Sequence, residues 1–159
     1  MLFRSIPSAK PPHKAAPDLA SPRQRWHMLQ LALAGNPRFT ADDVELRRGG
    51  KSYSIDTVVE LQRRQPRAEF FFIIGSDSVQ ELHRWKEADR LVRLCRFIVL
   101  ARPGFRVTGP LARRCKVVTG HLCEIASREI RQRVRRGESI RYLVPDAVFR
   151  YIHARKLYL

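Results

Sequence analysis

Gly75-Ser76-Asp77 is the first short segment whose residue types and position suggest chemistry. It directly follows the apolar run Phe70–Ile74, which is typical of a buried parallel strand. A glycine at the end of such a strand lets a ligand approach the backbone, and an aspartate there can accept hydrogen bonds from ribose hydroxyls. A helix cap formed by Ser76 or Asp77 explains the same residues equally well, so both interpretations stay open.

Ser127 and Arg131 form a second candidate, because they lie one helical turn apart at the expected start of a helix. The serine hydroxyl, the free backbone N–H groups of a helix start and the guanidinium group can converge on one phosphate group. A capped helix with an exposed arginine is the simpler explanation, since 25 of the 31 basic residues are arginine.

Trp85 and the pair His13-Lys14 complete the candidates. The indole ring of Trp85 can stack on a heteroaromatic ring, although a tryptophan more often packs in a core. Pro11 and Pro12 precede the pair and stiffen its loop, which would hold both side chains in place. Solvated loop charges are the commoner explanation of such a pair.

Other kinds of active site leave no signal in the chain. There is no Ser-His-Asp set, no P-loop and no G-x-G-x-x-G turn. Four histidines lack the spacing of metal ligands, namely His27, His83, His121 and His153. The cysteines are odd in number and form no Cys-x-x-Cys pair, which argues against a disulfide framework and a four-cysteine zinc site. We therefore expect no metal-ligating side chains and a reduced, cytoplasmic location.

Alternating strands and helices have to position these residues. Apolar runs predict strands at Leu2–Ile6, Phe39–Leu46, Phe70–Ile74, Phe97–Ala101 and Lys116–Thr119. Helical spacing, caps and terminators predict helices at Ser21–Gly35, Ser54–Pro66, Lys86–Leu94, Ser127–Arg136 and Pro145–Lys156, and a further one opening at Gly75-Ser76-Asp77. The hydroxyls of Ser21 and Ser54 are the expected caps of the first two helices. This order predicts an α/β fold with a mostly parallel sheet, in which ligands bind beyond the carboxyl ends of the strands.

Length and charge narrow the class of protein. A chain of 159 residues with 44% apolar content predicts a single domain over residues 1–159. No stretch approaches the roughly 18 apolar residues that cross a bilayer, so no membrane is expected. The net charge of +16 attracts anions, from nucleotides to nucleic acid. Because the basic residues are spread along the whole chain, charge alone does not decide the function.

Taken together and in order, several segments resemble one known family. They are Ile6–Lys14, Glu45–Arg48, Ser52–Thr57, Phe72–Ser78, Leu82–Trp85, Arg102–Gly104, Ile125–Arg131 and Ser139–Pro145. In this order they resemble bacterial nicotinate-nucleotide adenylyltransferase, over nearly the whole chain from about Ile6 to Leu159. The combination is highly specific, although no single segment is.

The resemblance implies a Rossmann-like nucleotidyltransferase fold and a reaction in NAD biosynthesis. Such enzymes transfer AMP from ATP to nicotinate mononucleotide, give nicotinate adenine dinucleotide, and release pyrophosphate with the help of Mg²⁺. The small-molecule partners are therefore ATP and nicotinate mononucleotide. The phosphate of the mononucleotide attacks the α-phosphorus in line, without a covalent enzyme intermediate, and the protein mainly positions groups and neutralises charge.

The resemblance also implies roles for individual residues. For nicotinate mononucleotide, Trp85 would stack on the nicotinate ring, Ser54 (usually threonine in the family) would offer a hydroxyl to the ring's carboxylate, and Lys14 would lie near the phosphate. For ATP, the implied residues are Gly75 and Asp77 at the adenosine portion, and Ser127, Arg131 and Arg102 at the triphosphate.

Two departures from the family pattern bear on activity. Ala126 and Arg128 replace a serine and a threonine of the Ile-Ser-Ser-Thr-x-x-Arg signature. The family's opening strand, its His-x-Gly-His turn and the following helix have no counterpart, so the catalytic histidines are not assigned. That strand would lie between Leu2–Ile6 and Phe70–Ile74. We therefore expect little or no turnover unless an upstream segment is restored, with a start upstream of Met1 as the simplest explanation and an inactive remnant as the alternative.

Three rival functions remain. A related nucleotidyltransferase acting on phosphopantetheine does not explain Trp85 or Ser52-Tyr53-Ser54. A basic nucleic-acid-binding module lacks a groove-reading motif or stacking platform, and nucleic acid is therefore not expected as a partner. A folded but inactive scaffold is the third.

Overall fold

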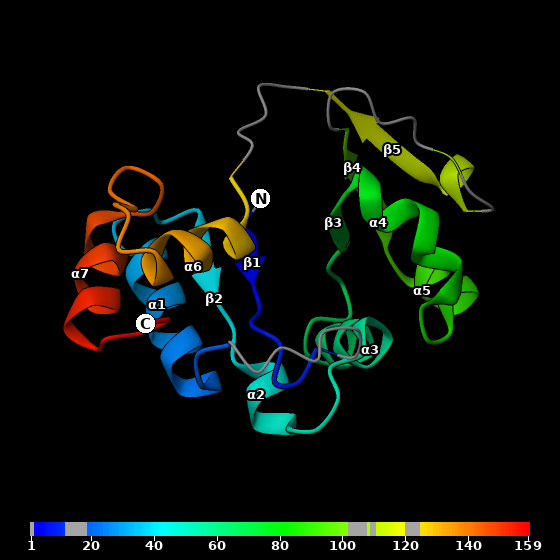
Figure 1. The fold of residues 1–159 in the computed structure, drawn as a ribbon. Helices are drawn as coiled ribbons and strands as arrows, with labels where there is room; N and C mark the ends of the chain where they lie inside the picture. Colours follow the sequence, from blue (N-terminus) through cyan, green and yellow to red (C-terminus); the bar gives the residue numbers. More distant parts are fainter. Residues whose placement is uncertain (1, 12–18, 102–107, 109–110, 120–124) are drawn as a thin grey trace. The chain divides into compact units, whose positions relative to one another are not determined.

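The computed structural model describes residues 2–11, 19–101, 108, 111–119 and 125–159 (Figure 1). These residues form two compact units, and each is described by itself. The first unit consists of Met1–Ser52 and Glu124–Leu159, so it is built from both ends of the chain. The second unit is the continuous segment Tyr53–Cys123.

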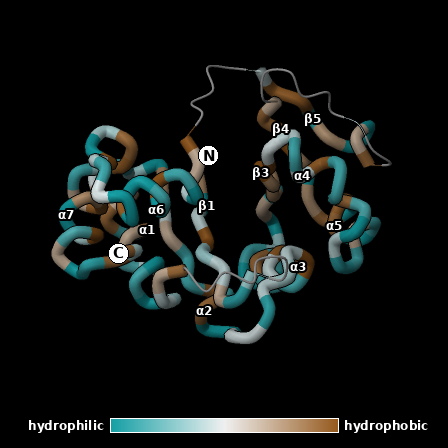
Figure 2. The backbone as a smooth tube through the Cα atoms, viewed as in Figure 1, coloured by the Kyte–Doolittle hydropathy of each residue, from teal (hydrophilic) through white to brown (hydrophobic). Residues whose placement is uncertain are grey.

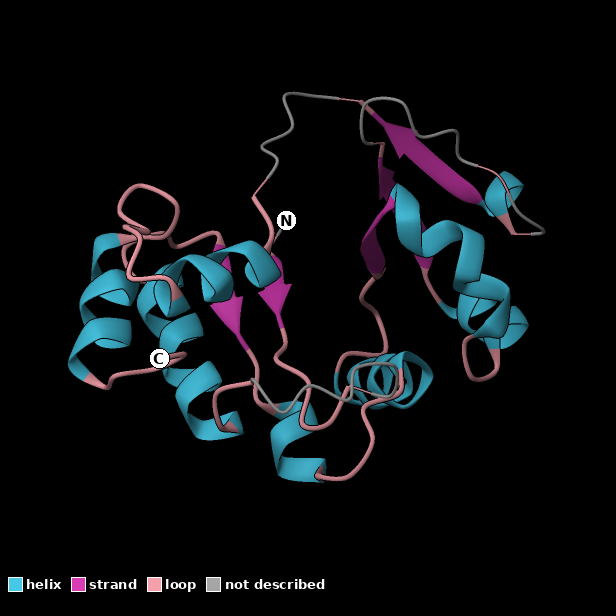
Figure 3. Ribbon diagram, in the orientation of Figure 1, coloured by secondary structure: helices cyan, strands magenta, loops and turns pink. Residues whose placement is uncertain are grey.

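The first unit contains a parallel pair of strands and four helices (Figure 3). The strands are β1 (Phe3–Ser5) and β2 (Phe39–Ala41), and the helices are α1 (Pro22–Leu33), α2 (Val44–Arg48), α6 (Ser127–Arg135) and α7 (Asp146–Ala154). Phe3 is in register with Phe39, and their rings stack with centroids 4.9 Å apart. The unit's core lies around α6 and α7 and consists of Val134, Ile140, Val148, Ile152 and Leu157.

Helix α1 begins as its sequence predicts. The Ser21 hydroxyl accepts a hydrogen bond from the Gln24 backbone N–H at 3.2 Å, and the Ser21 N–H donates to the Gln24 side chain at 2.8 Å. This reciprocal pair is a capping box, and Pro22 occupies the first helical position. The chain leaves α1 through Gly35, whose φ of 85° lies in the left-handed region that glycine adopts most easily.

The second unit is an α/β unit around a three-stranded parallel sheet of order β3-β4-β5. The strands are β3 (Phe71–Gly75), β4 (Arg96–Leu100) and β5 (Cys115–Val118). The helices are α3 (Ser54–Arg64), α4 (Ser76–Glu81) and α5 (Ala88–Leu94), with short 3₁₀ turns η1 (Leu82–Arg84) and η2 (Ala112–Arg114). The apolar strands stand out in brown in Figure 2.

The two faces of this sheet differ. On one face, Ile74, Phe97 and Val99 are buried in a core that also takes residues from α3, α4 and α5. On the other face, Phe71 and Ile73 are 39% and 42% exposed. The expectation that Phe70–Ile74 is buried on both faces is therefore wrong, because helices of the unit cover one face and leave alternate side chains of β3 exposed.

The strand predicted at Phe39–Leu46 is also wrong in its second half. The strand β2 ends at Ala41, and the helix α2 starts at Val44. The Asp42 carboxylate accepts a hydrogen bond from the Val44 backbone N–H at 2.9 Å, which turns the chain into a helix. The alternation of Val44 and Leu46 was too short to outweigh this local bond.

The remaining predicted elements are confirmed within a few residues at their ends. All the described strand pairs are parallel, which agrees with the predicted α/β class. None of the helices in the described part of the chain has the length and apolar character that a bilayer-spanning segment requires.

Candidate functional site

The turn at Gly75-Ser76-Asp77 joins β3 to α4, as predicted. Gly75 is the last residue of β3 and the N-cap of α4, so Ser76 and Asp77 are the first two helical residues. Capping by either side chain is therefore not what the structure shows, since the cap position belongs to glycine. Ser76 is fully buried, whereas Asp77 is exposed at the carboxyl end of β3.

Gly75 leaves room beside it for the side chain of Asp77, and its backbone angles do not call for glycine. Its φ of −78° is open to any residue, but a Cβ atom on Gly75 would lie 2.5 Å from the Asp77 Oδ1. The Asp77 carboxylate thus folds over Gly75 into space that a side chain would occupy. Glycine therefore permits this position of the carboxylate, whose exposed oxygens can accept hydrogen bonds from ligand hydroxyls.

Ser54 is the first residue of α3 and is half-buried. The N-cap is Tyr53, so the prediction that Ser54 caps this helix is wrong by one position. At the first helical position, the Ser54 hydroxyl and the unpaired N–H groups of the first turn lie at the positive end of an eleven-residue helix. This end of α3 can bind an anionic group.

Trp85 lies in the turn between η1 and α5 and is half-buried. Its ring meets the Phe72 ring edge-on, with centroids 5.9 Å apart, and Phe72 stacks on the buried Phe97 at 5.3 Å. The indole is thus backed by the core of the unit without being enclosed by it. Packing and ligand stacking are compatible here, because an edge contact leaves part of the indole surface uncovered.

Lys86, the next residue, connects the Trp85 turn to the start of α3. Its Nζ lies 3.0 and 3.2 Å from the two oxygens of the Asp56 carboxylate. The same ammonium group lies 4.9 Å from the centre of the Tyr53 ring. Sequence reasoning missed these contacts, since they join residues about 30 positions apart. They bring the turn of Trp85 to the helix start that carries Ser54.

Ser127 and Arg131 lie on α6 in the first unit, one turn apart as predicted. Ser127 is exposed and is the first helical residue, while Ala126 is the N-cap and has no side-chain acceptor. The expected serine cap is therefore wrong by one position. The exposed hydroxyl and the free N–H groups of the first turn remain suited to a phosphate group.

Arg131 is half-buried and has a neighbour that the sequence did not reveal. Burial raises the pKa of the Tyr158 hydroxyl, and the positive charges of Arg131 and Arg25 oppose that rise. Arg25 in turn donates to the backbone carbonyl oxygens of Ala9 and Ala20, both at 3.1 Å. Two guanidinium groups therefore lie near one phenol from the last turn of the chain.

Two of the predicted site residues, Lys14 and Arg102, lie outside the described residues. The others fall into two groups that are described separately. The second unit carries Ser54, Gly75, Asp77 and Trp85, and the first carries Ser127 and Arg131.

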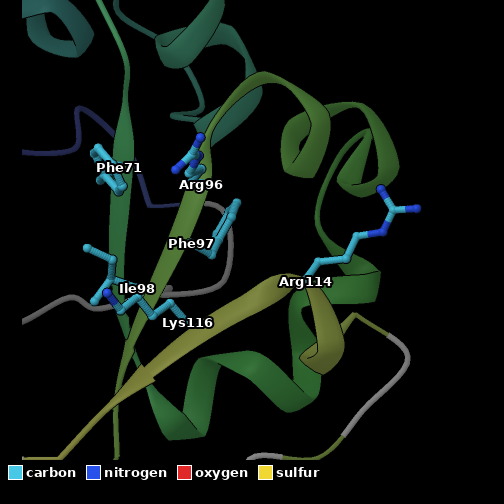
Figure 4. Close-up of a pocket in the computed structure, with 6 residues that line it drawn as sticks. All are labelled: Phe71, Arg96, Phe97, Ile98, Arg114 and Lys116. Carbon is cyan, nitrogen blue, oxygen red and sulfur yellow. The ribbon is translucent and has the colours of Figure 1, made fainter.

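A cavity of about 370 Å³ lies on the sheet of the second unit, and its residues are drawn in Figure 4. The lining residues are Phe71, Arg96, Phe97, Ile98, Arg114 and Lys116. Phe71 and Arg96 are the first residues of β3 and β4, so this cavity lies toward the amino ends of the strands. Parallel sheets bind ligands at the opposite edge, where Gly75 and Asp77 lie. We therefore do not assign the cavity to the candidate site.

Comparison with known proteins places this geometry in context. The cytidylyltransferase-like family matches residues 2–133. The chain is 41% identical to a probable nicotinate-nucleotide adenylyltransferase of Geotalea uraniireducens, over 96% of this chain and 82% of that relative. It is also 41% identical to the probable nicotinate-nucleotide adenylyltransferase of Geobacillus kaustophilus, over 96% of this chain and 70% of that relative.

Solved structures show the same fold. The chain is similar to the Plasmodium falciparum nicotinic acid mononucleotide adenylyltransferase complexed with NaAD, with a TM-score of 0.78 and 18% identity over 99% of this chain and 82% of that one. A putative nicotinate-nucleotide adenylyltransferase of Vibrio parahaemolyticus gives a TM-score of 0.68 at 16% identity, over 99% of this chain and 78% of that one. These likenesses confirm the predicted Rossmann-like nucleotidyltransferase fold.

Proposed function

The chain belongs to the nicotinate-nucleotide adenylyltransferase family, and we propose that its site transfers an adenylyl group from ATP to nicotinate mononucleotide. The products are nicotinate adenine dinucleotide, a precursor of NAD, and pyrophosphate. In the transfer, an oxygen of the mononucleotide phosphate attacks the α-phosphorus of ATP. The bond from that phosphorus to the bridging oxygen breaks, and pyrophosphate leaves in line.

The half-buried indole of Trp85 is the observation that carries this proposal. Phe72 backs it edge-on, and the contacts of Lys86 link its turn to the start of α3. We assign Trp85 to stacking on the pyridine ring, and the hydroxyl of Ser54 to the ring's carboxylate. The positive end of α3 favours a carboxylate there. A phosphopantetheine substrate has no aromatic base that would use this indole.

The ATP side of the proposed site uses different chemistry. We assign the exposed Asp77 carboxylate, which lies over Gly75, to the ribose hydroxyls of ATP. Ser127 and Arg131 are assigned to the triphosphate, supported by the free N–H groups at the start of α6. Arg102 for ATP and Lys14 for the mononucleotide phosphate complete the assignment on the family resemblance alone.

Mg²⁺ is proposed to enter with ATP. In the described part of the chain, no three His, Cys, Asp or Glu side chains are grouped as ligands for a metal ion. A Mg²⁺ ion that takes most of its ligands from phosphate oxygens and water needs no such group. When bound, the ion neutralises charge on the phosphates of ATP. The residues of this chain orient the two nucleotides so that the attacking oxygen meets the α-phosphorus.

We further propose that the enzyme works in the cytoplasm on small molecules, without nucleic acid as a partner. Three cysteines without a Cys-x-x-Cys pair favour a reducing compartment. The basic residues are scattered rather than grouped on a reading element, which favours nucleotides over nucleic acid.

The test is a substrate panel under Mg²⁺ and ATP, with nicotinate mononucleotide, nicotinamide mononucleotide and phosphopantetheine. It is run on residues 1–159 and on the same chain preceded by the opening strand, turn and helix of a family member. We expect both samples to bind nicotinate mononucleotide, and the extended one to form nicotinate adenine dinucleotide and pyrophosphate in equal amounts. Preference for phosphopantetheine, or no binding of nicotinate mononucleotide by either sample, would overturn the proposal.

A further inference from the structure

We propose that Lys86 is a positioning residue, which holds the Trp85 turn against the start of α3 so that the indole and Ser54 face one substrate. The inference rests on the proposed function. It concerns a side chain whose role no pattern in the sequence indicates.

The contacts of Lys86 lie on either side of Ser54. Tyr53, whose ring lies under the ammonium group at 4.9 Å, is the residue before Ser54, and Asp56, whose carboxylate oxygens are 3.0 and 3.2 Å away, is two residues after it. Trp85 is covalently adjacent to Lys86. One side chain thereby couples the two residues that we assign to the pyridine ring and its carboxylate.

A role in global stability does not account for this arrangement. The Lys86 and Asp56 side chains are 42% and 34% exposed, and ion pairs this exposed contribute little to folding. The backbone of the turn is nevertheless in an uncommon conformation, since Glu87, directly after Lys86, adopts a left-handed φ of 51°. Residues other than glycine rarely adopt this φ, so contacts of neighbouring side chains are needed to hold it. The pair therefore acts on the local conformation of the turn, which is what a stacking platform requires.

The test measures binding of nicotinate mononucleotide and nicotinamide mononucleotide to residues 1–159 by calorimetry. Replacing Lys86 with Met keeps much of the side chain's length and removes its charge. We expect Lys86→Met to weaken both ligands equally, about two- to fivefold, which is the range for loss of an exposed ion pair. Asp56→Asn should weaken them by no more than Lys86→Met, and the double variant should bind like Lys86→Met, because both changes break the same ion pair. Lys86→Arg should restore affinity.

Two readouts separate positioning from other roles. With Trp26→Phe as background, Trp85 is the remaining tryptophan. Lys86→Met should then increase the quenching of Trp85 fluorescence by acrylamide, while the melting temperature stays unchanged. The matched control is Arg96→Gln at the start of β4, which breaks the exposed Arg96–Glu69 pair and the contact of Arg96 with the Phe71 ring, and should leave affinity intact.

The outcomes are distinct. If the unaltered chain does not bind nicotinate mononucleotide, the proposed function fails and this inference with it. If it binds and Lys86→Met binds equally well, the inference alone is wrong. Weakening of the nicotinate ligand only would contradict positioning and show direct contact of the ammonium group with the carboxylate.

Discussion

The two groups of candidate residues are held in place by different forces. Around Trp85, apolar packing dominates, since the indole rests on Phe72 and Phe72 on the buried Phe97. Around Ser127 and Arg131, charge dominates, since of the nine residues of α6 Val134 alone is buried and four are arginine. The difference suits the proposed ligands, because a pyridine ring is recognised by stacking and a triphosphate by cations and helix-terminal N–H groups.

This contrast has a measurable consequence. Stacking on a surface backed by a core depends little on ionic strength, whereas attraction of exposed arginines to phosphate is screened by salt. The same protein should therefore bind its two nucleotides with different salt dependence. Substitutions in each group test this contrast.

The largest effects are expected from Trp85→Ala in the second unit and Arg131→Gln in the first, whose expected losses are of similar size. Stacking of a base on an aromatic side chain contributes about 1–3 kcal/mol, so affinity for nicotinate mononucleotide should fall roughly 5- to 150-fold. Trp85→Phe keeps a stacking face and should lose less. Calorimetric titration at low and high salt measures both variants, and Trp26→Ala in α1 is the control that should bind normally. Equal affinity of Trp85→Ala and the unaltered chain would contradict the assignment.

Arg131→Gln should weaken the binding of ATP. A charge-assisted hydrogen bond contributes about 1.5–3 kcal/mol, so affinity for ATP should fall roughly 10- to 150-fold at low salt. The difference in ATP affinity between Arg131→Gln and the unaltered protein should shrink as the salt concentration rises. Salt screens the attraction between Arg131 and the phosphates, so the unaltered protein also binds ATP more weakly. Arg136→Gln, which alters an exposed arginine at the end of the same helix, should change ATP affinity little. An equal loss in both variants would mean that only overall charge matters.

Gly75→Ala should affect ATP binding more mildly. Alanine tolerates the backbone angles of Gly75, but its Cβ would displace the Asp77 carboxylate. We expect affinity for ATP to fall about fivefold, in line with about 1 kcal/mol for a displaced hydrogen bond. If Gly75 acts through Asp77, Gly75→Ala should add nothing to Asp77→Ala. Additive losses in the double variant would show that the glycine itself approaches the ligand.

The smallest effect concerns the stability of the second unit at alkaline pH. Burial raises the pKa of the Cys95 thiol to about 11. The unfolded chain then loses this proton at lower pH than the folded chain. The free energy of unfolding should therefore decline between about pH 9 and 11, by at most about 1.4 kcal/mol per pH unit. Urea unfolding at pH 8 and 10 measures the decline, and Cys95→Ala should reduce it. If the free energy of unfolding of Cys95→Ala falls by the same amount between pH 8 and 10, other titrating groups cause the pH dependence.

The sequence predicted what depends on neighbours along the chain. The serine cap at Ser21, the turn of Gly75-Ser76-Asp77 and the one-turn spacing of Ser127 and Arg131 were all predicted from local chemistry. Errors of one position at Ser54 and Ser127 arose because a serine at the first helical position resembles a serine cap.

Long-range contacts were beyond such reasoning. The contact of Lys86 with Asp56 and Tyr53, and the proximity of Tyr158 to Arg131, join residues about 30 positions apart. These contacts join residue types that are common throughout the chain, so no sequence pattern predicts them. The exposed face of β3 was missed for a related reason, because an apolar run does not say which of its faces helices will cover.

Fluorescence of the two single-tryptophan variants tests the central claim most directly. Trp26→Phe leaves Trp85 as the emitter, and Trp85→Phe leaves Trp26, so each is titrated with nicotinate mononucleotide. A pyridine ring stacked on the indole at position 85 should quench the first variant with a saturating curve and leave the second unchanged. Quenching that follows Trp26, or saturable binding without any change at Trp85, would contradict the account.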